Sequence, residues 1–62
     1  MPANTAADVC FVFQVLVDGV PAMNGTYPIT VTVYAPTEQR ARTAAAFHLD
    51  EGETVGEVLE AS

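Results

Sequence analysis

The sequence predicts an α+β fold, a small ββαβ domain in which one helix packs on one face of a three-stranded sheet. Two segments, Val9–Val17 and Pro28–Ala35, are rich in β-branched and aromatic residues, which are typical of strands. A third, Glu38–Leu49, is rich in Ala and contains neither Gly nor Pro, which favours a helix. We assign residues 1–8 to an irregular N-terminal segment and residues 9–62 to a single domain.

The two faces of the expected strand Val9–Val17 differ in an unusual way. Its odd-numbered residues are all apolar and share one side of an extended chain, so we assign this side to the core. A second side that met water would be polar, yet it carries Cys10, Val12 and Leu16 around Gln14. We therefore expect a second copy of the protein, or another partner, to cover it. The candidate interface takes this side of both strands: Cys10, Val12, Leu16, Thr30, Thr32 and Tyr34.

The chain between these strands contains two turn signals, Asp18-Gly19 and Asn24-Gly25. Two interpretations follow. Either Asp18–Tyr27 forms one long hairpin loop, or Val20–Met23 adds a short strand between two tight turns. We expect the single loop, because Pro21 has no N–H to donate and would have to lie at a sheet edge.

The expected helix has clear start and stop signals. Pro36 ends the second strand because it cannot donate to the ladder. Thr37 takes the N-cap position and Glu38 the first turn, where a carboxylate meets the positive end of the helix dipole. Gly52 follows the helix. The expected buried stripe, Ala41, Ala44, Ala45 and His48, follows helical spacing and is flanked by Phe47 and Leu49.

The C-terminal segment Glu53–Ser62 fits either a helix or a strand. We expect a third strand near Thr54–Glu60, because a two-stranded hairpin under one helix is only marginally stable. The helix then connects the second strand to a third strand parallel to it. The first strand, which is apolar on both sides, takes the centre, so the predicted strand order is 2-1-3.

The charge of the chain limits its partners. The net charge is −6, with eight carboxylates against two arginines and no lysine. Nucleic acids are bound through clustered Lys and Arg, so we expect no nucleic-acid partner and no anionic membrane surface. Five carboxylates follow the expected helix and form a candidate docking patch for a basic protein: Asp50, Glu51, Glu53, Glu57 and Glu60.

No residue pattern indicates catalysis. Cys10 is the only cysteine and His48 the only histidine, so the usual zinc sites lack ligands. Phosphate-binding, calcium-loop and nucleophile motifs are absent from the sequence. We expect no enzyme activity and no cofactor. The N-terminal segment lacks the apolar core of a signal peptide, and no apolar run is long enough to span a membrane, so we expect a cytoplasmic protein.

Together these observations favour a small acidic, non-catalytic protein–protein interaction module that forms a homodimer through its sheet. The alternative is an acidic inhibitor that mimics nucleic acid and docks on a basic protein surface. The oligomeric state separates the first function from the second, and salt-dependent binding of a basic protein would identify the second.

Overall fold

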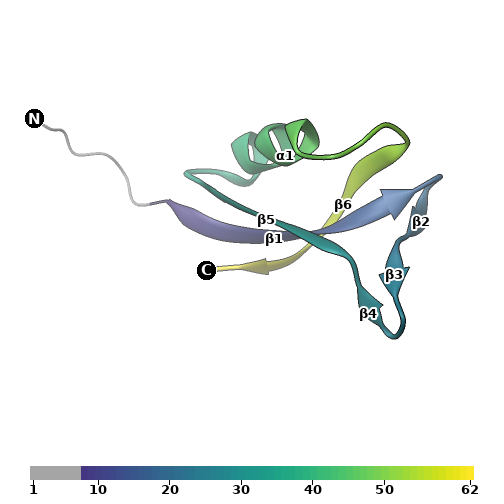
Figure 1. Cartoon of the computed structure of the whole chain (residues 1–62). Coiled ribbons are helices and arrows are strands. Elements are labelled where there is room, and N and C mark those ends of the chain that lie inside the picture. The colour runs from purple at the N-terminus through teal and green to yellow at the C-terminus, as the bar shows by residue number, and fades with distance from the viewer. Residues whose placement is uncertain (1–7) are drawn as a thin grey trace, which may run out of the picture.

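The computed structural model describes residues 8–62 and contains one helix packed on an antiparallel sheet (Figure 1). The long strands are β1 (Val9–Val17), β5 (Thr30–Ala35) and β6 (Glu53–Ala61), and α1 is the helix Glu38–Phe47. Both β5 and β6 run antiparallel to β1, so they are parallel to each other and lie on either side of it. The predicted α+β fold with its 2-1-3 order is confirmed.

The prediction of an irregular segment over residues 1–8 lies outside the described residues except for Asp8, which belongs to no helix or strand. The third strand is confirmed and is longer than expected, because β6 extends beyond both ends of Thr54–Glu60. Backbone hydrogen bonds of 2.7 and 3.0 Å in both directions between Cys10 and Ser62 continue its pairing with β1. The register shifts twice between β6 and β1, so β6 follows β1 with two bulges.

The segment between β1 and β5 contains three further strands. These are β2 (Val20–Pro21), β3 (Met23–Asn24) and β4 (Tyr27–Pro28). Strand β2 pairs with β1, whereas β3 and β4 pair with each other. The expectation of one loop over Asp18–Tyr27 is therefore wrong. Pro21 is accommodated because β2 lies at the edge of the sheet, where a missing N–H leaves no partner unsatisfied.

Two tight turns explain why this segment forms strands. Asp18 and Gly19 both have positive φ, at 55° and 77°, as a type I′ hairpin turn requires. Gly25, at 67°, makes the turn between β3 and β4. The predicted second strand Pro28–Ala35 is correspondingly interrupted at Ile29, which belongs to neither β4 nor β5.

Residues 20–29 project from the sheet, and we call them the arm. In Figure 1 the arm extends from the end of β1 on the side opposite α1. Three backbone hydrogen bonds hold its base. The Ala22 N–H donates to the Val15 carbonyl (2.8 Å), the Val15 N–H to the Ile29 carbonyl (3.1 Å), and the Ile29 N–H to the Ala22 carbonyl (2.9 Å). The direction of the arm is therefore set by the sheet.

The core lies between α1 and the odd-numbered side of β1, as predicted. Phe13 is completely buried, and Phe11 and Val15 are nearly so. Ala41 and Ala45 of α1 are also completely buried, because their small side chains let the helix axis approach the sheet. The assignment of odd-numbered strand residues to the core is wrong only near the base of the arm, where Val17 and Ile29 are each 41% exposed.

The helix begins as predicted and ends earlier. The Thr37 hydroxyl oxygen accepts the Arg40 backbone N–H at 3.2 Å, which confirms the N-cap. At the other end, the His48 and Leu49 N–H groups donate three residues back, to Ala45 and Ala46. This tightening ends the helix at Phe47 instead of Leu49.

The buried stripe is therefore shorter than expected. Ala41, Ala44 and Ala45 follow it, but Phe47 is 84% exposed and His48 is also exposed. His48 lies just beyond the last helical residue, as the C-cap. Leu49 is half-buried.

Candidate interaction surface

Among the described residues, α1 covers one face of the sheet, and we call the opposite face the open face (Figure 1). Directly opposite residues on antiparallel strands share a face. The register of β1 with β5 therefore places Cys10, Val12, Thr30, Thr32 and Tyr34 on the open face. Leu16 joins them by alternation along β1, so the face contains all of the sequence-predicted interface residues.

Burial differs across the open face. The β1 residues Cys10, Val12 and Leu16 are half-buried by their neighbours, whereas Thr32 and Tyr34 of β5 are exposed. The central strip is thus apolar and lies beside a border of hydroxyl-bearing side chains. A surface of this composition suits contact with another protein better than it suits acid–base chemistry, because it brings no pair of carboxylates or imidazoles together.

Gly56 shapes the β6 side of the open face. A Cβ added there would lie 3.0 Å from the Gln14 Oε1 atom and 3.1 Å from both the Gln14 carbonyl oxygen and the Leu16 Cδ2 atom. The missing side chain lets Gln14 and Leu16 lean over β6. No local signal in the sequence connects Gly56 to β1.

Cys10 and Tyr34 are direct cross-strand neighbours at one end of the open face. A side-chain hydrogen bond with Cys10, the charge of the Cys10 thiolate, and burial, in decreasing order, raise the pKa of the Tyr34 phenol. A tyrosine phenol is already protonated at neutral pH, and the raised pKa keeps Tyr34 uncharged to higher pH. It presents a neutral donor and a 68% exposed ring to any partner.

Arg42 connects the helix to β6 on the covered face. Its Nη1 atom donates to the Gly56 carbonyl oxygen at 2.8 Å, and its Nε atom donates to the Glu38 carboxylate at 3.3 Å. The guanidinium carbon lies 5.2 Å from the centre of the Phe13 ring. Glu38 and Arg42 lie four residues apart in the sequence, a spacing that favours an ion pair on a helix. The contacts of Arg42 with Gly56 and Phe13 join segments far apart in the chain, so the sequence does not predict them.

The five carboxylates of the predicted docking patch are distributed along β6 and the turn before it. Glu53 lies opposite Val17 on the covered face, whereas Glu60 lies opposite Val12 on the open face. Glu53 is half-buried, and its Oε1 atom accepts the Asp50 backbone N–H at 2.8 Å. The other four, Asp50, Glu51, Glu57 and Glu60, are exposed. The structure does not bring all five to one face.

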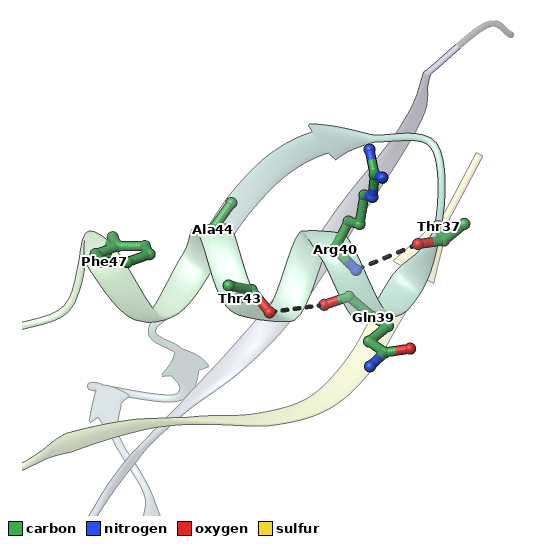
Figure 2. A pocket seen from close by; sticks show the side chains of 6 residues that line it. All are labelled: Thr37, Gln39, Arg40, Thr43, Ala44 and Phe47. Atoms are coloured by element: carbon green, nitrogen blue, oxygen red, sulfur yellow. Dashed lines mark hydrogen bonds between the residues drawn. The ribbon is translucent and has the colours of Figure 1, made fainter.

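A hollow of about 600 Å³ lies along one side of α1 (Figure 2), with Arg40 and Phe47 towards its two ends. Its hydroxyl groups serve the helix itself. Thr37 accepts the Arg40 backbone N–H, and the Thr43 hydroxyl donates to the Gln39 carbonyl, both at 3.2 Å. Only one charged side chain belongs to its lining, which consists of Thr37, Gln39, Arg40, Thr43, Ala44 and Phe47.

Within residues 8–62, no group of three or more His, Cys, Asp or Glu side chains is placed to hold a metal ion. In the same range, α1 is too short and too polar to cross a membrane. The chain matches no family model, no curated protein and no solved structure.

Proposed function

We propose that this protein is a small acidic, non-catalytic interaction module that forms a homodimer through the open face. The carrying observation is the apolar strip of Cys10, Val12 and Leu16 on the side of β1 that α1 leaves uncovered. A sheet face exposed to water is normally polar. A chain of 62 residues also has little stability to spare, so burying this strip against a second copy would stabilise the fold.

The distribution of charge supports a second copy as the occupant. Asp18 is the only charged residue between Val9 and Thr37, and this stretch contains β1, the arm and β5. Two copies that each carry a net charge of −6 repel each other, so their contact surfaces need to be free of carboxylates. The β1 and β5 residues of the open face meet this requirement, whereas Glu60 of β6 lies at the border of the face.

Sedimentation across micromolar concentrations tests the proposal. We expect a species of twice 6.5 kDa, and we expect the double variant Val12→Thr/Leu16→Thr to dimerise about tenfold more weakly or worse, because each side chain loses apolar burial. Phe47→Thr is the matched control, since it removes an exposed apolar side chain from the helix instead. A wild-type protein that stays monomeric would falsify the proposal.

A second candidate function is an acidic inhibitor that docks on a basic protein surface. It is favoured by one observation: within the described residues, Glu38 is the only carboxylate in an ion pair, which leaves the others available to cations. Capture of proteins from a lysate at low and high salt tests it. Retention of a basic protein that salt abolishes supports docking, and retention that ignores salt counts against it. For either function the proposed compartment is the cytoplasm, where Cys10 would stay reduced.

A further inference from the structure

The arm, residues 20–29, exposes more apolar surface than a short hairpin normally does. Val20 is 62% exposed, Met23 51% and Tyr27 75%. Exposed hairpins usually end in polar turn residues, and two strands of two residues each bury too little to be stable alone. The arm nevertheless has a defined direction, because its base is bonded into the sheet at Ala22 and Ile29.

The arm and the open face lie on the same side of the sheet. It extends on the side of the sheet opposite α1 (Figure 1), so it borders the space that a partner on the open face would occupy. From Ala22 to the turn at Gly25 the arm spans three residue steps, or about 10 Å at the usual rise per residue. Packed sheets lie about 10 Å apart. An arm of this length therefore reaches the sheet of a second copy.

The distribution of charge favours a second copy of the chain, and not a basic protein, as the partner of the arm. The arm contains no charged residue, and beyond β2, which pairs with β1, its strands β3 and β4 pair only with each other. A basic partner would be drawn to the carboxylates of residues 38–62, whereas an identical acidic copy is best met by uncharged surface. Backbone hydrogen bonds between Val15 and both Ala22 and Ile29 hold this uncharged arm beside the uncharged β1 and β5 part of the open face.

From these observations we propose that the arm of each copy packs against the open face of the other, with Met23 and Tyr27 as its contact residues. The inference rests on the proposed homodimer and adds its geometry. A twofold pair makes the contact reciprocal, so each dimer contains it twice. Exchange of an arm in this way buries the exposed Met and Tyr together with the apolar strip of β1.

The first test compares dimer dissociation constants by sedimentation equilibrium. We expect Met23→Ser/Tyr27→Ser to weaken dimerisation about tenfold or more, since aromatic anchors dominate interfaces. The control Phe47→Ser, which removes an 84% exposed aromatic from the helix, should leave it unchanged. Circular dichroism should show both variants folded, because none of the three side chains belongs to the core. If the arm variant dimerises as tightly as the wild type, the arm proposal is overturned and the homodimer stands.

The second test locates the contact directly. Two proteins are mixed, Cys10→Ala/Thr26→Cys with a thiol only at the tip of the arm, and Cys10→Ala/Thr32→Cys with a thiol only on the open face; alanine keeps position 10 apolar. We expect a bismaleimide to join the two kinds of chain, and we expect Val12→Thr/Leu16→Thr in both chains to abolish the product. A mixture that sediments as a dimer but gives no joined chains overturns the arm contact alone. A mixture and a wild type that both remain monomeric overturn the contact and the proposed function together.

Discussion

Phe13 shows most directly how single residues support the fold. It is fully buried, stacks 6.0 Å from Phe11 and lies under the Arg42 guanidinium. On the opposite side of the same strand, Val12 is only half-buried. One residue of β1 therefore packs in the core while the next lies on the open face, because a strand turns successive side chains to opposite faces.

Phe13→Ala should remove about 3–5 kcal/mol of folding stability, because the cavity cannot be refilled by the small alanines of α1. Domains of this size have about that much in total, so we expect a largely unfolded protein by circular dichroism. Val12→Thr/Leu16→Thr should remain folded. If Phe13→Ala is tolerated and the double variant unfolds, then the two faces of β1 have been assigned the wrong way round.

Arg42 illustrates how much the surroundings of a charge matter. Arg42→Met keeps the aliphatic stem but loses the hydrogen bond to the Gly56 carbonyl and the contact with the Phe13 ring, so we expect a loss of about 1–2 kcal/mol. Glu38→Gln removes only an exposed ion pair and should change stability by no more than about 0.5 kcal/mol. Urea denaturation at one fixed protein concentration measures both. Equal effects would mean that Arg42 acts only through Glu38.

At the scale of elements, each boundary follows from a local backbone requirement. The type I′ turn needs two positive φ angles, which Asp18 and Gly19 supply. The helix needs a side-chain acceptor before its first turn, which Thr37 supplies. Strand β6 follows β1 through two bulges, and its Gly56 leaves room for Gln14 and Leu16.

The N-cap can be tested separately from the core. Thr37→Ala should lower stability by about 1 kcal/mol, because the Arg40 N–H loses its acceptor, whereas Thr37→Asp keeps an acceptor and adds a favourable charge at the helix N-terminus. The urea midpoint should fall for the first variant and hold for the second, with an unchanged m-value in both. A fall of the same size in both would assign the effect to packing of the threonine methyl group.

At the scale of the molecule, the division of charge sets the response to salt. The stretch from Val9 to Thr37 has Asp18 as its one charged residue and contains the arm and the β1 and β5 part of the open face. Seven other carboxylates and two arginines supply the rest of the net charge of −6. Contact between two such copies is opposed by repulsion of the rest of the molecule. Docking on a basic protein is instead favoured by attraction to the same carboxylates.

Raising the salt concentration should therefore strengthen the homodimer, because screening weakens the repulsion. It should weaken any complex with a basic protein. Sedimentation equilibrium in low and high sodium chloride measures the first effect, and the melting temperature of the wild type should rise with protein concentration under both conditions. A homodimer that salt dissociates would contradict an uncharged interface.

The sequence by itself determined the parts of this protein that depend on neighbours along the chain. Alternation in Val9–Val17 assigned the core side of β1, and Pro36 with Thr37 placed the start of α1. The same alternation assigned the predicted interface residues to one side of the sheet. The pairing of β1 with β5 keeps them on that side, because directly opposite residues share a face.

The tertiary structure alone decided what depends on contacts between distant segments. The segment Asp18–Tyr27, predicted to be one loop, forms a tight turn and most of the arm, because β2 pairs with the edge of β1 at Leu16 and Val17, which no local pattern reveals. Phe47 was expected beside the buried stripe but lies outside it, since the last helical turn tightens. The bulges of β6 and the place of Gly56 follow from matching β1 across the sheet, and such a match has no trace in either segment alone.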